Sequence, residues 1–121
     1  MAKILVVEDS KFQRLKITKT LKKLGYEVFE ATDGIEGLKL SKEVNADLLM
    51  TDILMPNLDG IGLIKELKAN DFDKPIVVLT SDIQKPVREE VEALGITKFL
   101  NKPLDEYELE LTLRRILTPA A

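Results

Sequence analysis

Six side chains that could do chemistry stand at the ends of four short apolar segments of this chain. In chain order they are Glu8, Asp9, Asp52, Thr80, Ser81 and Lys102. The segments are "KILVV", "ADLLMT", "PIVVLT" and "TKFLN", and each of them leads into at least one of these polar groups. A carboxylate is rarely buried without a partner, because removing its charge from water is costly. An acid such as Asp52, directly after an apolar segment, therefore indicates a functional role.

The charges of this set indicate a divalent cation and a phosphoryl group. Three acids carry about −3 and Lys102 carries +1, which leaves −2 for a metal ion. Mg²⁺ prefers oxygen ligands with positions left to water, and it commonly works with phosphate groups. An unperturbed aspartate has a pKa of about 3.9, so Asp52 could attack phosphorus without a general base. The product would be an aspartyl phosphate, held by Lys102 and the Thr80 hydroxyl.

Each residue also has an ordinary structural interpretation. Asp9 or Ser10 could cap a helix, the two hydroxyls could belong to a turn, and the lysine could be a solvated loop residue. Asp52 could cap its own loop. Four such coincidences at four strand ends of a single domain are harder to accept than one shared site.

The elements that must position these residues alternate between apolar and amphipathic segments. Strands are predicted at 3–7, 27–31, 46–51, 75–80 and 97–101, and helices at 11–24, 34–44, 60–69, 85–94 and 105–117. This alternation predicts an α/β fold, (βα)5 and doubly wound: a five-stranded parallel sheet with helices on both faces, in three layers. Functional groups of such folds gather at the carboxyl ends of the strands, where all six residues are predicted.

Composition excludes several classes of function. The 121 residues are expected to form one domain, 1–121, with no output domain in this chain. There is no cysteine and no histidine, which excludes disulfides, thiolate catalysis, Ser-His catalysis and a phosphohistidine carrier. The start "MAKILVVED" lacks a signal peptide and no apolar run reaches membrane-spanning length, so we expect a cytoplasmic protein without membrane insertion. The basic charge of residues 1–23 is offset by an acidic remainder, which argues against direct nucleic-acid binding.

Four motifs resemble the CheY-like receiver domains of response regulators. They are "VVEDS", "TDILMPNLDG", "LTS" and "FLNKP", in this order and over nearly the whole chain. The flavodoxin-like fold of that family agrees with the predicted topology. The resemblance implies that Asp52 accepts a phosphoryl group from a histidine kinase or phosphotransfer protein, with no enzymatic turnover beyond self-phosphorylation from small donors and self-dephosphorylation. It also implies that Glu8, Asp9, Asp52 and the backbone carbonyl of Leu54 bind Mg²⁺.

The resemblance assigns further roles around the phosphoacceptor. Lys102 would contact the phosphoryl group, and Pro103 would follow a cis peptide bond. Thr80 and Phe99 would switch the surface around the fourth helix, fifth strand and fifth helix, which an unknown downstream protein reads. The rim residues are Ser81, Leu54 and Asp82. The apolar Leu54 stands where many receivers carry a polar residue, and we expect it to slow self-dephosphorylation, whereas Asp82 could instead order the attacking water.

The first predicted helix has two apolar faces. At 100° per residue, Ile17, Leu21 and Leu24 form the core stripe, and Phe12 and Leu15 lie roughly opposite. The second pair is predicted to dock the phosphodonor, with a basic rim of Lys11, Arg14, Lys16 and Lys19. Isolated exposed apolar residues are the simpler interpretation.

Two other function classes compete with a receiver. Haloacid-dehalogenase-type phosphatases carry D-x-D at a strand end, but the segment here is Asp52-Ile53-Leu54, without the second acid. No glycine-rich nucleotide motif is present. The remaining alternative is a phosphate-independent, receiver-like interaction module.

Overall fold

Five strands alternate with five helices in the computed structural model, which describes residues 2–81, 84–96 and 98–117. The strands are β1 (Lys3–Val7), β2 (Glu27–Ala31), β3 (Leu48–Asp52), β4 (Ile76–Thr80) and β5 (Lys98–Asn101). The helices are α1 (Lys11–Lys23), α2 (Gly34–Glu43), α3 (Gly60–Ala69), α4 (Lys85–Ala93) and α5 (Glu106–Leu117). Every element predicted from the sequence is present, and no end differs by more than two residues.

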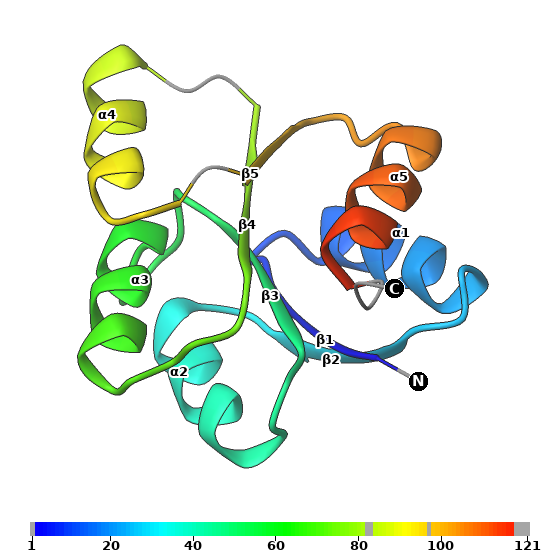
Figure 1. The fold of residues 1–121 in the computed structure, drawn as a ribbon, viewed down its shortest axis with the longest axis horizontal. Coiled ribbons are helices and arrows are strands. Elements are labelled where there is room, and N and C mark those ends of the chain that lie inside the picture. Colours follow the sequence, from blue (N-terminus) through cyan, green and yellow to red (C-terminus); the bar gives the residue numbers. More distant parts are fainter. Residues whose placement is uncertain (1, 82–83, 97, 118–121) are drawn as a thin grey trace.

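The strands form one parallel sheet in the order β2-β1-β3-β4-β5. Helices α1 and α5 cover one face and α2, α3 and α4 cover the other, giving three layers (Figure 1). The predicted doubly wound topology is therefore confirmed. The chain runs from β1 outward to β2 and then crosses to β3, so the strand order reverses between β1 and β3. A crevice at the carboxyl ends of such a strand pair is where doubly wound folds bind ligands.

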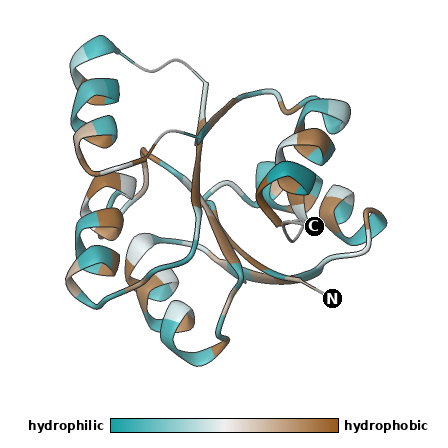
Figure 2. Cartoon of the chain, viewed as in Figure 1, coloured by the Kyte–Doolittle hydropathy of each residue, from teal (hydrophilic) through white to brown (hydrophobic). Residues whose placement is uncertain are grey.

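The two faces of the sheet bury separate apolar clusters, because side chains alternate along each strand. Ile4 and Val6 pack with residues of α1 and α5, and Leu5 and Val7 pack with residues of α2, α3 and α4. Figure 2 shows the hydrophobic residues concentrated in the strands, while the helices carry both kinds. None of the described helices combines the length and apolar character needed to cross a bilayer.

Helix α1 presents the two faces that the sequence predicted, with one difference. Ile17 and Leu21 are buried, whereas Phe12 is 76% exposed and Leu15 is 52% exposed. Leu24 is only half-buried, because it caps the end of α1 rather than lying within its last turn. The core stripe therefore ends at Leu21.

The loop after β3 is held against the end of that strand by Gly60. The Gly60 N–H donates to the Ile53 carbonyl, with an N···O distance of 2.8 Å. A Cβ atom at Gly60 would lie 2.2 Å from the Asp52 carbonyl oxygen, so only glycine allows this approach. Asp59 caps α3 by accepting from the Gly62 N–H at 2.8 Å. These contacts fix the route of the chain beside Asp52.

Candidate functional site

The strand register brings the predicted site residues to one edge of the sheet. Asp52 pairs with Leu79, so Thr80 is the next residue along β4. Thr80 pairs with Asn101, and the Lys102 N–H donates to the Thr80 carbonyl at 2.7 Å. Lys102 thus emerges beside the end of β4, on the same edge as Asp52.

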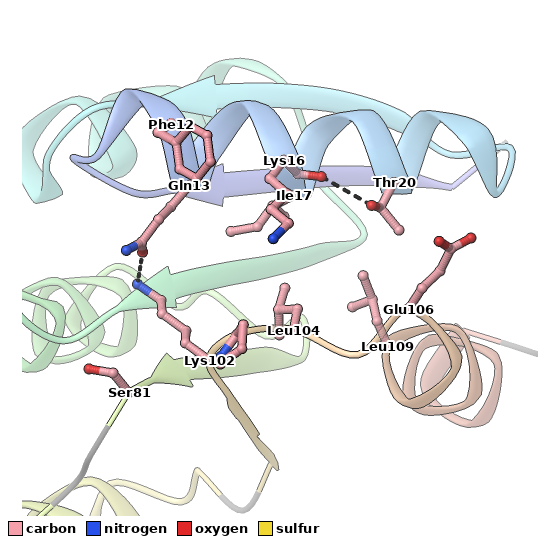
Figure 3. A pocket seen from close by; sticks show the side chains of 11 residues that line it. Phe12, Gln13, Lys16, Ile17, Thr20, Ser81, Lys102, Leu104, Glu106 and Leu109 are labelled. Carbon is pink, nitrogen blue, oxygen red and sulfur yellow. Dashed lines mark hydrogen bonds between the residues drawn. The ribbon is translucent and has the colours of Figure 1, made fainter.

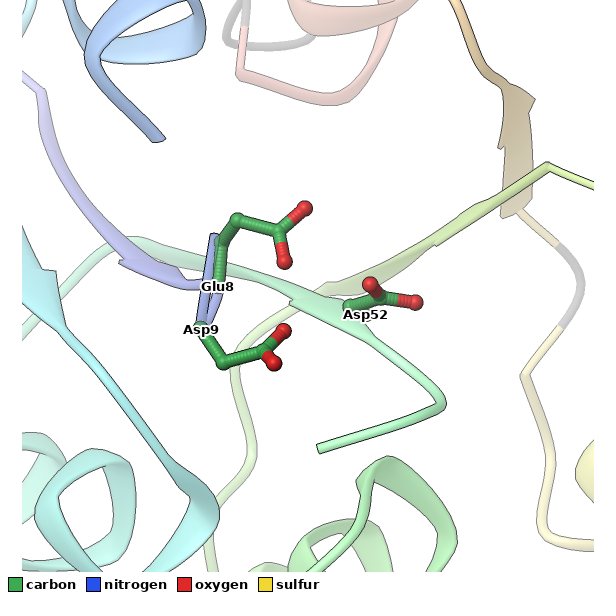
Figure 4. Close-up of side chains that lie close together, drawn as sticks. All are labelled: Glu8, Asp9 and Asp52. Carbon is green, nitrogen blue, oxygen red and sulfur yellow. The ribbon is translucent and has the colours of Figure 1, made fainter. Parts of the chain in front are cut away.

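Three carboxylates face one another at this edge. Each of Glu8, Asp9 and Asp52 offers a carboxylate oxygen that lies within 4.8 Å of those of the other two (Figure 4). Glu8 is fully buried, Asp52 is half-buried and Asp9 is exposed, so the cluster opens to solvent on the side of Asp9. Oxygen donors at this spacing suit a hard divalent cation.

The Lys102 ammonium is held by two of these acids. Its Nζ donates to Asp52 Oδ2 at 2.8 Å and also to Glu8 Oε1. Burial acts to lower the pKa of Lys102, but the hydrogen bonds to Asp52 and Glu8 outweigh it and raise the pKa above its usual value. Lys102 is therefore a cation fixed next to Asp52.

Glu8 is the most deeply buried acid of the cluster. Burial raises its pKa, the hydrogen bond from Lys102 opposes that shift, and the charge of Asp52 adds to it. The backbone N–H of Ser10 also points at Glu8, with an N···O distance of 3.4 Å. One lysine offsets only part of the negative charge here, which leaves room for a further cation.

Asp52 is the last residue of β3, and both of its oxygens have partners. Oδ1 accepts from the Ile53 N–H at 2.6 Å and lies 3.4 Å from the Leu54 nitrogen, while Oδ2 accepts from Lys102. The Asp52 side chain is 16% exposed to solvent. An incoming group can therefore reach a carboxylate whose orientation is already set.

The remaining predicted residues lie around this centre. Thr80 is buried and Ser81 is exposed at the end of β4, and the peptide bond before Pro103 is cis. Leu54 is 80% exposed beside Asp52. Phe99 is half-buried on β5. Asp82 lies outside the described residues.

The polar contacts of two residues, Gln13 and Arg14, were not predicted. Gln13 Oε1 accepts from Lys102 Nζ at 2.6 Å. Arg14 was expected in the basic rim of α1, but its side chain is only 13% exposed and donates to the Glu8 carbonyl at 2.8 Å and to Glu30 at 3.1 Å. Both residues belong to the first turns of α1. The sequence showed only that both residues lie a few positions after Asp9. That spacing does not determine the direction in which a side chain points.

Comparisons with known proteins agree with this geometry. The family model described as "Response regulator receiver domain" matches residues 4–114. Protein PilH of Pseudomonas aeruginosa is 32% identical over 119 residues, which cover 97% of this chain and 98% of PilH. The structure of chemotaxis protein CheY4 of Vibrio cholerae has a TM-score of 0.90 at 34% identity and covers 97% of this chain and 99% of its own.

A third relative contains a metal ion. The receiver domain of the sensor histidine kinase PA1611 of Pseudomonas aeruginosa has a TM-score of 0.88 at 31% identity, covers 98% of both chains, and holds magnesium in its active-site cleft. Some curated relatives are much longer: this chain spans 8% of a sensor protein and about half of two regulators. The matches extend over almost all of this chain, so the chain belongs to the response regulator receiver domain family.

Proposed function

We propose that Asp52 accepts a phosphoryl group from a histidine kinase or a histidine phosphotransfer protein in two-component signal transduction. The observation that carries this proposal is the 2.8 Å contact between Asp52 Oδ2 and Lys102 Nζ at the carboxyl edge of the sheet. A carboxylate nucleophile and a phosphoryl group repel each other, and a fixed cation beside the nucleophile offsets that repulsion. Membership in the receiver family supports the same role.

The proposed transfer needs no general base. A carboxylate oxygen of Asp52 forms a bond to phosphorus while the P–N bond to the donor's imidazole breaks. The electron pair of that bond stays on the imidazole nitrogen, which leaves a neutral ring when the other ring nitrogen carries a proton. Lys102 and the Thr80 hydroxyl donate to the transferred oxygens. We expect the reaction to take place in the cytoplasm, where ATP is available to phosphorylate the donor.

Mg²⁺ is the proposed cofactor, held by Glu8, Asp9, Asp52 and the backbone carbonyl of Leu54. The three carboxylates fit such an ion, because their oxygens lie within 4.8 Å of one another and one side of the cluster is open to solvent. The magnesium in the cleft of the PA1611 receiver supports the same ion here. When bound, the ion would offset the charge of the phosphoryl oxygens near Asp52.

The proposed output is a change of the surface formed by α4, β5 and α5. Thr80 is buried at the end of β4, and Phe99 lies on the adjacent β5, paired with Val78. Movement of the Thr80 hydroxyl toward a phosphoryl group leaves space into which the Phe99 ring can turn. A downstream protein would read the altered surface.

The donor is proposed to dock on the exposed pair Phe12 and Leu15 at the start of α1. Both side chains are more than half exposed, although Leu15 lies one helical turn farther from the site than Phe12. A helical donor with apolar and acidic residues would complement the pair and the exposed Lys11, Lys16 and Lys19. A donor bound to this surface would have its phosphorylated histidine near Asp52.

Acetyl phosphate and Mg²⁺ test the proposed function on a gel that retards phosphorylated protein. A retarded band that disappears in Asp52→Asn supports the phosphoacceptor. Fast, continuous release of inorganic phosphate from acetyl phosphate would instead indicate a phosphatase. A wild-type protein that never shifts would indicate the phosphate-independent interaction module.

A further inference from the structure

Gln13 on helix α1 forms a side-chain contact with the active-site lysine, Lys102. Gln13 is the third residue of α1, and its Oε1 accepts from Lys102 Nζ at 2.6 Å (Figure 3). Its backbone N–H donates to the Ser10 hydroxyl that caps α1, at 3.3 Å. The start of the helix is therefore fixed, and the Gln13 side chain reaches from it toward Lys102.

This contact completes the hydrogen bonding of the ammonium. A lysine ammonium has three N–H donors and no acceptor. Glu8 and Asp52 accept two of them, and Gln13 accepts the third. Glu8 and Asp52 are proposed to bind the metal, and Asp52 also to receive the phosphoryl group. Gln13 is neutral and lies outside the cluster of three acids. It is therefore the one of the three acceptors that neither binds the proposed metal ion nor receives the phosphoryl group.

A cavity beside Lys102 explains why a third partner matters. It has a volume of about 440 Å³ between α1 and α5, and Gln13 and Lys102 line it together with Phe12, Ile17 and Leu104 (Figure 3). A long, flexible lysine next to such a space can swing away from Asp52. The bond to Gln13 opposes that movement.

We propose that Gln13 is a positioning residue that keeps Lys102 aimed at Asp52 when the carboxylates are engaged by metal and phosphoryl group. This inference rests on the proposed function, since it concerns the lysine that is to bind the transferred group. It assigns the first turn of α1 a role in the reaction itself, in addition to the proposed docking of the donor.

Three variants distinguish the effect of the Gln13–Lys102 hydrogen bond from the effect of side-chain size. Gln13→Met keeps the length and removes the acceptor, and Gln13→Glu keeps an acceptor oxygen. Gln84→Met is the matched control, because Gln84 is the other glutamine of the chain and its side chain makes no capping bond at α4. Circular dichroism and thermal melting verify that each variant is folded.

The first readout needs neither metal nor phosphate. In protein labelled with ¹⁵N-lysine, ammonium protons held in hydrogen bonds exchange slowly with water and give a visible NMR signal, which Lys102→Arg identifies. We expect Gln13→Met to broaden or remove that signal, and Gln13→Glu and Gln84→Met to keep it. A Lys102 signal unchanged in Gln13→Met overturns the inference.

The second readout is the rate of labelling by acetyl phosphate as a function of Mg²⁺ concentration. Loss of one hydrogen bond to a charged group, partly replaced by water, should slow Gln13→Met on the order of threefold to tenfold. The Mg²⁺ concentration for half-maximal labelling should not change, because Gln13 is not a ligand. Equal rates in Gln13→Met and wild type, or equal slowing in Gln13→Met and Gln13→Glu, overturns the inference. Failure of the wild type to become labelled overturns the proposed function instead.

Discussion

The guanidinium carbon of Arg88 lies 4.3 Å from the centre of the Phe99 ring. Arg88 belongs to α4 and Phe99 to β5, so this cation–π contact joins two elements of the proposed output surface. It stabilises the half-buried position of the ring seen in the structure. If phosphorylation turns Phe99 inward, this contact must break, and Arg88 favours the unphosphorylated conformation.

Arg88→Ala should therefore shift the protein toward its phosphorylated conformation. A cation–π contact at an exposed site contributes about 0.5–1 kcal/mol, which corresponds to about two- to fivefold in an equilibrium constant. The affinity for beryllofluoride, a phosphoryl analogue, should rise by that factor when measured by calorimetry with Mg²⁺ present. Lys98→Ala, an exposed cation on β5, is the control. Unchanged or weaker binding by Arg88→Ala would show that the contact does not restrain the ring.

Leu54→Asn should shorten the lifetime of the phosphorylated protein. The Leu54 side chain is 80% exposed next to Asp52, where we expect it to exclude or disorder the water that attacks the phosphoryl group. An amide at this place could orient that water, and a hydrogen bond of about 1 kcal/mol corresponds to about fivefold in rate. The half-life is measured after removal of the donor. Ile35→Asn, at an apolar residue of α2 that is 59% exposed, is the matched control. A longer or equal half-life in Leu54→Asn contradicts the prediction.

Replacing Phe12 and Leu15 together by serine should slow phosphorylation by the protein donor about tenfold or more, since central apolar contacts dominate an interface. Labelling by acetyl phosphate should not change, because neither side chain is part of the acid cluster. The double variant of Tyr107 and Leu111 to serine is the control, as this exposed aromatic and leucine lie on α5. A parallel fall of both rates would mean that the substitutions disturb the site rather than docking.

Asp33 should stabilise the fold in a pH-dependent way. Its Oδ1 accepts from the Glu36 N–H at 2.8 Å and its Oδ2 accepts from the Asn57 amide at 2.7 Å. The Glu36 bond and then the Asn57 bond hold the pKa of Asp33 below its usual value of 3.8. Because the folded state favours the charged form, this stabilisation is complete above the unfolded pKa and is lost as the pH falls through the folded pKa.

Asp33→Ala should accordingly lower the free energy of unfolding by about 1 kcal/mol at pH 7, the usual cost of losing a helix N-cap. Urea denaturation from pH 7 to pH 3 is the measurement, and the difference between wild type and variant should shrink only below about pH 4. A difference that stays constant across this range would exclude the charged form as the cause.

The sequence predicted the acid cluster because strand ends are local signals. Asp52 and Lys102 each follow an apolar segment, and a parallel sheet must bring the carboxyl ends of its strands together. Gln13 and Arg14 could not be predicted in the same way. Their contacts depend on the rotation of α1 about its axis and on its position between β2 and the loop after β5. Both are set by tertiary packing and cannot be obtained from the local sequence. The same applies to Leu24, whose spacing fits the core stripe although the helix ends before it.

Asp52 is the residue proposed to receive the phosphoryl group, and its chemical product can be identified directly. Borohydride reduces an aspartyl phosphate to homoserine, so the acceptor can be located by peptide mass spectrometry after incubation with a phosphorylated donor and Mg²⁺. We expect homoserine at position 52 in the wild type and none in Asp52→Asn, with unmodified Glu8 and Asp9 in both. Homoserine at another position, or equal labelling of Asp52→Asn, would contradict the assignment of Asp52 as the phosphoacceptor.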